Sequence, residues 1–175
     1  MKTLQSVTLS LAFSSALLLI SGAANAANEW GIEGEEKARF QAKVVDIACE
    51  LTGNCPDNCG DGKRQLGLLR DDGTLLLVMK NFDTFAGGVN DLIGFCGKQV
   101  EVDGLLITTL HMPVFAVQFK RAPEGKWSRA NQFSKDWSAA NGQKAAQWFR
   151  NDPTVIETIK AKGVFGVPGL EPEAE

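Results

Sequence analysis

Hydrophobic and polar residues alternate with a period of two along several stretches in the middle of the chain, which is the pattern of strands with one buried face. Asp72-Gly73 separates two of these stretches and predicts a hairpin turn, because Asp-Gly supplies the positive φ that tight turns need. Asp103-Gly104 lies inside the fourth stretch and predicts a bulge or bend there. The predicted strands are residues 40–47, 65–70, 74–79, 98–110 and 114–120.

Between the third and fourth predicted strands, the apolar spacing changes to that of a helix. Gly87-Gly88 weakens this helix, so we expect it to be short. Five strands with one helix between the third and the fourth is the element order of an OB-fold, a small, partly open Greek-key barrel. We therefore predict a mainly β fold with an α extension; another five-stranded barrel or a meander sandwich is the alternative. The helical apolar positions are Phe82, Phe85, Val89, Leu92 and Ile93.

The strand pattern stops near Gly125, and the rest of the chain is rich in Ala, Gln and Lys. We predict an OB-like barrel domain over residues 27–124 and a C-terminal helical extension over residues 125–175 that packs on the barrel. Three tryptophans of this extension, interleaved with basic residues, are a candidate partner-binding face. The interpretation that we favour is that they cover the open side of the barrel. They are Trp127, Trp137 and Trp148.

The last helix has clear signals at both of its ends. Asp152 is a good N-cap, Pro153 suits the first helical position, and Gly163 suits the end of the helix. We expect its apolar side chains to face the core. They are Val155, Ile156 and Ile159.

Residues 1–26 have the features of a secretory signal peptide. Lys2 gives a positive start, an apolar run extends from Leu9 to Ile20, and Ala24-Asn25-Ala26 is an A-x-A cleavage signal. The apolar run is shorter than the about 20 residues of a membrane span, so we expect cleavage after Ala26 in preference to a retained anchor. The mature protein would then be periplasmic or secreted, without a membrane span, in a compartment that permits disulfides.

Charge and composition narrow the possible functions. The formal net charge is −3 and no basic block is present, which argues against nucleic-acid binding. The chain has a single histidine, His111, and no G-x-S-x-G motif, so a conventional hydrolytic triad is not expected. We therefore favour a protein that is not an enzyme.

The chain has four cysteines, three of them in a Gly-, Asn- and Asp-rich loop over residues 52–62 or just before it, for which we expect no regular structure. In an OB-fold the first and fourth strands pair antiparallel, which favours a Cys49–Cys96 disulfide. Cys55 and Cys59 would then form a local bridge or a thiol pair. The alternative pairs Cys49 with Cys55 or Cys59, and the remaining loop cysteine with Cys96.

Cys55-Pro56-Asp57-Asn58-Cys59 resembles the Cys-Pro-Asp-x-Cys site of the Sco copper-delivery family. The resemblance implies that Cys55 and Cys59 are copper ligands, with His111 as the third. The predicted topology places His111 at the far end of the fourth strand, so a two-thiolate Cu(I) site is the form of this hypothesis that needs no histidine.

Three further motifs lie in a longer stretch: Asp46-x-x-Cys49, Gly67-Leu68-Leu69 and Gly94-Phe95-Cys96-Gly97-Lys98-x-Val100-x-Val102-x-Gly104. Together they resemble small exported bacterial OB-fold-like proteins with a Cys-rich first loop. The likeness covers about residues 40–120 and departs from several of those proteins in lacking a histidine within the cysteine loop. It implies a fold and a compartment, but no reaction.

Taken together, these patterns predict an exported periplasmic OB-fold module, a binding or accessory subunit that docks a protein partner, for example in a redox complex. In this interpretation the disulfides are structural and no cofactor is required. The alternative is a copper-handling or dithiol redox protein that uses Cys55 and Cys59.

Overall fold

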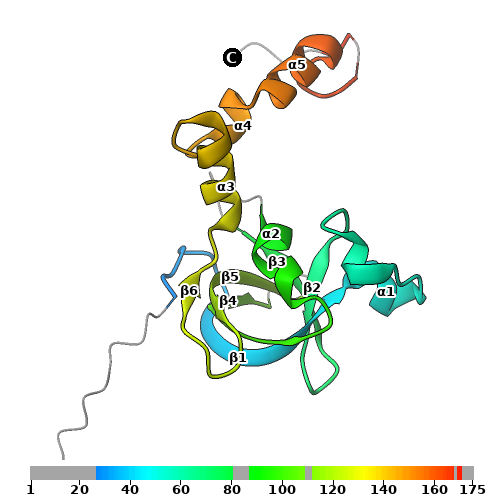
Figure 1. Ribbon diagram of the computed structural model, residues 1–175, viewed down its shortest axis with the longest axis vertical. Helices are drawn as coiled ribbons and strands as arrows, with labels where there is room; N and C mark the ends of the chain where they lie inside the picture. The colour runs from blue at the N-terminus through cyan, green and yellow to red at the C-terminus, as the bar shows by residue number, and fades with distance from the viewer. Residues whose placement is uncertain (1–26, 81–86, 109–111, 168, 171–175) are drawn as a thin grey trace, which may run out of the picture.

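The computed structural model describes residues 27–80, 87–108, 112–167 and 169–170 of the 175-residue chain. Strands form the first part of the described chain and helices the last (Figure 1). The elements are β1 (Glu35–Asp46), α1 (Ile47–Thr52), the 3-10 helix η1 (Asp57–Gly60), β2 (Leu66–Leu69), β3 (Leu75–Met79), α2 (Gly88–Leu92), the 3-10 helix η3 (Ile93–Phe95), β4 (Gln99–Ile107), β5 (Val114–Arg121), β6 (Ser128–Arg129), α3 (Gln132–Asn141), α4 (Trp148–Asn151) and α5 (Pro153–Lys162).

The strands form a closed barrel with one additional strand. Their order is β3-β2-β1-β4-β5-β6, and a parallel pairing of β3 with β5 closes the barrel. The long strand β1 pairs with β4 through most of its length and with β2 near its end, both antiparallel. With α2 between β3 and β4, this confirms the predicted mainly β, OB-like barrel with a helical extension.

The predicted turn and bulge are both present. Gly73 has a φ of 83° and its N–H donates to the carbonyl of Arg70, which closes the hairpin between β2 and β3. The β4–β5 register shifts between Asp103 and Gly104. A Cβ at Gly104 would lie 2.1 Å from the carbonyl oxygen of Ala116, so the bulge requires glycine.

The boundaries predicted for the first strand are wrong. β1 begins at Glu35, because the residues before Phe40 also pair with β4, and it ends at Asp46, because Ile47 begins α1. The loop expected to be irregular contains η1. The short helix after β3 is confirmed from Gly88 onward, whereas its expected positions Phe82 and Phe85 lie outside the described residues.

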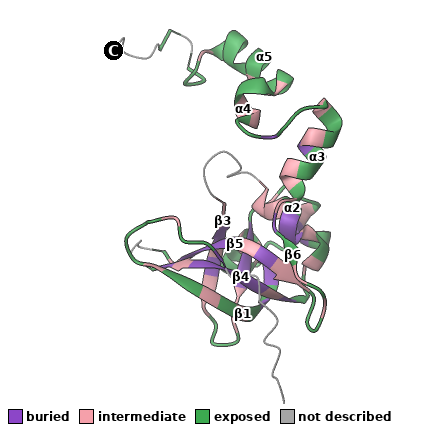
Figure 2. Cartoon of the chain, turned by 90° about the vertical axis from the view of Figure 1, so that its left-hand side faces the viewer, coloured by how far each residue is buried: buried purple, intermediate pink, exposed green. Residues whose placement is uncertain are grey.

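The core lies inside the barrel (Figure 2). Phe115 of β5 is fully buried and meets Phe40 of β1 edge to face, with ring centroids 4.8 Å apart. Burial of each large apolar side chain contributes about 1.5–3 kcal/mol. The other fully buried large side chains of this core are Val44, Leu66, Leu68, Leu76, Leu92, Val100, Val102 and Val117.

The helical extension begins beside the barrel and leads away from it. Figures 1 and 2 show α3 next to α2, with α4 and α5 standing at its far end. Asp152 caps α5 and Pro153 opens it, as predicted. The expectation that Val155, Ile156 and Ile159 face the core is wrong, because α5 packs against α4 and has no buried residue. The division between barrel and extension near residue 125 stays a prediction.

Among the described residues, no helix is long and apolar enough to cross a membrane.

Candidate functional site

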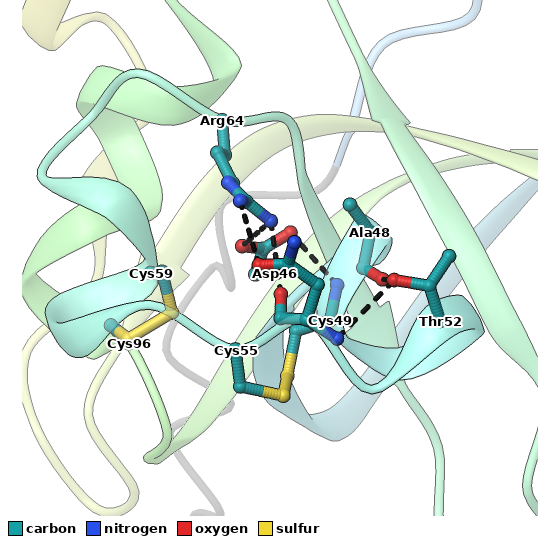
Figure 3. Close-up of polar contacts among 9 residues, drawn as sticks. Asp46, Ala48, Cys49, Thr52, Cys55, Cys59, Arg64 and Cys96 are labelled. Carbon is teal, nitrogen blue, oxygen red and sulfur yellow. Dashed lines mark hydrogen bonds and ion pairs between the residues drawn. A yellow bond between two sulfur atoms is a disulfide. The ribbon is translucent and has the colours of Figure 1, made fainter.

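The cysteine loop is organised by a buried aspartate at the end of β1. One Asp46 carboxylate oxygen accepts from the Cys49 N–H at 3.2 Å and caps α1, while the other lies 3.3 Å from Nη1 of Arg64 (Figure 3). The same guanidinium donates to the carbonyl of Asn54 at 3.0 Å. The carboxylate therefore fixes both the start and the return of the loop to the barrel.

The structure contains two disulfides, and their pairing corrects the favoured Cys49–Cys96 bridge. Cys49 is bonded to Cys55, with Cα atoms 4.5 Å apart, and Cys59 to Cys96, with Cα atoms 6.0 Å apart. This is one of the alternatives that the sequence left open. The described residues contain no free cysteine.

The physical reason lies in where β1 ends. The pairing of β1 with β4 places Cys96 beside Val44, whose carbonyl accepts from the Gly97 N–H at 2.9 Å. Two residues later β1 turns into α1, which carries Cys49 away from that position. Cys59 takes its place and packs in the barrel core. Sequence reasoning did not favour this pairing because it extended the first strand to Ile47 and did not recognise Asp46 as the N-cap of α1.

Around Cys59, which is bonded to Cys96, the backbone adopts an uncommon left-handed conformation. Asn58, Cys59 and Asp61 all have a φ between 47° and 51°, a conformation that costs residues other than glycine about 1–2 kcal/mol each. The Asn58 side-chain amide donates to the Asp61 carboxylate at 2.7 Å and offsets part of this cost. Cys59 is buried, whereas Cys55 is exposed.

The pairing bears directly on the copper hypothesis. Cys55 and Cys59 belong to different disulfides, so a two-thiolate site would require that both bonds be reduced first. His111, the third ligand that the resemblance implied, lies outside the described residues. In the part of the chain that the structure describes, no group of three or more His, Cys, Asp or Glu is placed to hold a metal ion. Copper binding stays a prediction.

A second buried aspartate joins the barrel to the extension. The Asp91 side chain in α2 is 1 % exposed, and its carboxylate lies 2.9 Å from Nζ of Lys80 and 3.0 Å from Nζ of Lys120. The backbone N–H of Gln132, at the start of α3, donates to the same carboxylate at 2.9 Å. Lys80 also donates to the carbonyls of Val117 and Ala130.

This cluster fixes where α3 begins, because its groups come from α2, β5, the segment after β3 and the start of α3. Burial lowers the pKa of Lys80, and the charge of Asp91 offsets part of that effect. Sequence reasoning missed the cluster. The signal that could have found it is Asp91 itself, a charged residue between the apolar helix positions Val89 and Leu92.

Trp137 is a structural residue within the extension. Its ring is buried, and its Nε1 donates to the Asp152 carboxylate at 2.9 Å, which ties α3 to the start of α5. This hydrogen bond, together with the N–H groups of Val155 and Thr154, holds the pKa of Asp152 below its usual range. The shape of the extension therefore depends on a charged cap.

The other two tryptophans are half-buried. Trp148 meets Phe133 edge to face, with centroids 4.9 Å apart. Trp127 has the guanidinium groups of Arg39 and Arg121 over its ring, 4.8 Å and 4.5 Å from the centroid. A role of the three tryptophans in partner binding stays a prediction.

The end of the extension carries exposed apolar side chains, of which sequence reasoning had assigned Ile156 and Ile159 to the core. Six large apolar side chains of α5 and the residues after it are 42–59 % exposed. We call this set the arm's apolar face, and the helices α3 to α5 with the residues that follow them the arm. The face consists of Ile156, Ile159, Val164, Phe165, Val167 and Leu170.

Comparisons with protein-family models, with curated proteins and with solved structures give no match for this chain.

Proposed function

We propose that the protein is an exported accessory module that docks a protein partner through the arm's apolar face. The observation that carries this proposal is the 42–59 % exposure of six large apolar side chains at one end of the molecule. Exposed large apolar side chains that gather in one region are typical of interaction sites in otherwise well-packed proteins.

The construction of the arm supports the proposal. Its base is fixed to the barrel by the hydrogen bond from Gln132 to the buried Asp91. Farther out, the Trp137–Asp152 hydrogen bond and the Trp148–Phe133 contact hold the helices to one another. An arm that is ordered before binding loses less conformational entropy on docking than a flexible tail would.

The chemistry of α5 favours a protein partner with an apolar groove and an acidic rim. Ile156 and Ile159 lie on one side of the helix, and Lys160 and Lys162 lie in its last turn. An amphipathic helix that inserts its apolar face into a groove is a common mode of recognition, and basic residues at the edge select an acidic rim.

Export is the second part of the proposal. Its support is the signal-peptide pattern of residues 1–26, together with two disulfides, which persist in oxidising compartments. A copper or dithiol function would instead require reduced Cys55 and Cys59, and it remains the alternative for a reducing environment.

Site-specific photo-crosslinking in cells that export the protein tests the docking role. A photoreactive amino acid is placed at Ile159, on the apolar face, or at Glu157, which helical geometry places on the opposite side of α5. We expect a discrete adduct with one other protein from position 159 and none from position 157. The Ile156→Glu exchange should abolish the adduct from position 159.

Three results would contradict the proposal. Equal adducts from both positions would indicate non-specific collisions, and no adduct from position 159 would indicate that the face has no partner. An adduct of two copies of this chain would indicate self-association instead of docking to another protein.

A further inference from the structure

Ala27, the residue after the expected cleavage site, is buried against a charged group. Its backbone nitrogen donates to one carboxylate oxygen of Asp103 at 2.9 Å. Asp103 sits at the β4 bulge and is 4 % exposed, and its other oxygen accepts from Nε of Arg39 at 2.8 Å. A backbone nitrogen at the very point of expected processing therefore faces a buried carboxylate.

The residues that follow Ala27 are also fixed to the barrel. The N–H of Asn28 donates to Gln118 of β5 at 2.9 Å, and the Gln118 amide donates back to the carbonyl of Asn28 at 2.6 Å. The N–H groups of Trp30 and Gly31 both donate to the Glu35 carboxylate at 2.8 Å. Side chains of β1, β4 and β5 thus hold this segment.

We propose that Ala27 is the mature N-terminus and that its α-ammonium group forms a buried ion pair with Asp103. A signal peptidase would hydrolyse the peptide bond between residues 26 and 27 with one water molecule. The carbonyl carbon of residue 26 takes the hydroxyl group, and the nitrogen of Ala27 takes the hydrogen. An α-amine has an ordinary pKa of about 7.7–8.0, so most of it is protonated at neutral pH.

The site fits an ammonium group well. Each Asp103 oxygen would face one cation, the ammonium at the first and Arg39 at the second. A cavity of about 280 Å³ beside Ala27, lined by Lys37, Ala38, Arg39 and Asp103, leaves room for water to accept the remaining ammonium protons. Lys37, which also lines this cavity, forms an ion pair with Glu29, with Nζ 3.0 Å from a carboxylate oxygen.

Processing would change the strength of this contact. The uncleaved chain offers Asp103 a neutral amide N–H, whereas the cleaved chain offers a charged donor at the same place. Charge-assisted hydrogen bonds are about twice as strong as neutral ones. Cleavage after Ala26 would therefore stabilise the barrel. This inference rests on the export part of the proposed function and does not involve the arm.

The test compares two exported forms of the full protein. One carries the natural cleavage site, and the other has Gly-Ser inserted between residues 26 and 27, so that the mature chain begins two residues before Ala27. Intact-mass measurement identifies each N-terminus. We expect the natural form to begin at Ala27 and to melt about 3 °C or more above the extended form.

Two exchanges in β4 show whether Asp103 is responsible. With Asp103→Asn, the difference in Tm between the natural and the extended forms should vanish. Glu101 lies on the same strand as Asp103 and pairs with Arg121 of β5. With Glu101→Gln, which removes that ion pair, the difference in Tm should persist. A mature chain that begins elsewhere, or equal Tm values for the natural and extended forms, would overturn the inference.

A second measurement covers the case in which Asp103→Asn does not fold. An amine-acylating reagent is applied at neutral pH to the natural and the extended forms, and labelling of the α-amine is followed by peptide mass spectrometry. We expect slow labelling of Ala27 and fast labelling of the extended N-terminus. Equal rates would show that the ammonium group is not held, whatever the outcome for partner docking.

Discussion

The barrel and the arm use apolar residues in opposite ways. In the barrel, large side chains such as Phe115 and Val100 are fully buried, and the disulfide of the buried Cys59 joins the cysteine loop to the core. In α5 no residue is buried (Figure 2), and Ile156 and Ile159 are among the exposed large apolar side chains. The barrel's apolar surface therefore stabilises the fold, whereas that of α5 contributes little to it.

This difference raises the question of what holds the arm in place while its apolar face stays exposed. Polar contacts hold the arm in place: Asp91 at its base and Asp152 within it. Because these contacts orient α5 without covering its apolar face, the face remains available to another molecule.

The largest loss of unfolding free energy is expected when Asp91, at the base of the arm, is replaced. Asp91→Asn leaves Lys80 and Lys120 buried without a countercharge, and breaking a buried ion pair in this way costs about 3–5 kcal/mol. Urea unfolding followed by tryptophan fluorescence measures the loss. Asp71→Asn, in the exposed hairpin turn, is the control and should change the free energy of unfolding by no more than about 0.5 kcal/mol. Equal effects of the two exchanges would contradict the role of Asp91.

The two disulfides should differ in their contributions to the barrel. The Cys59–Cys96 bond joins residues 37 positions apart, and its loop length predicts a loss of about 4 kcal/mol when both cysteines are replaced by alanine. The Cys49–Cys55 bond spans 6 positions and predicts a loss of about 2 kcal/mol. Urea unfolding of the two double variants tests this order. A larger loss of unfolding free energy for the Cys49–Cys55 variant would contradict the prediction that the stabilisation increases with the length of the closed loop.

Sequence patterns predicted the barrel well, because strand periodicity and turn residues are local signals. The Asp72-Gly73 hairpin and the Asp103-Gly104 bulge were both predicted from residue type alone and are confirmed. The order of strands and helix then led to the OB-like topology.

The candidate site was predicted less well, because it depends on contacts between distant residues. The favoured Cys49–Cys96 bridge failed because α1 redirects the chain, and sequence reasoning did not recognise Asp46 as the N-cap of that helix. The apolar spacing of Ile156 and Ile159 correctly defined one face of a helix, but spacing cannot tell what covers that face. Asp91 was missed because its partners lie on other elements.

A smaller effect, limited to the arm, is expected from acid. The pKa of Asp152 lies below its usual range, chiefly because Trp137 donates a hydrogen bond to the carboxylate. The stabilisation of the arm is therefore present at neutral pH and is lost as the pH falls through this lowered pKa. The indole N–H resonance of Trp137 should report the titration by NMR.

Asp152→Asn is the matched control, because asparagine is also a good N-cap and does not titrate. Its Trp137 resonance should stay constant in the acid range where the wild-type signal shifts. A wild-type midpoint at or above the usual aspartate range would contradict the charged hydrogen bond between Trp137 and Asp152.

Hydroxyl-radical footprinting of the purified mature protein tests the central claim most directly, namely that the arm keeps its apolar face out of the protein's own core. Phe165 of the arm's apolar face and Phe115 of the barrel core are the same residue type in opposite environments, 54 % and 0 % exposed. We predict fast oxidation of Phe165 and Ile159 and strong protection of Phe115. Protection of Phe165 equal to that of Phe115, in a protein shown to be monomeric, would contradict the account, because the arm would then be folded onto the barrel.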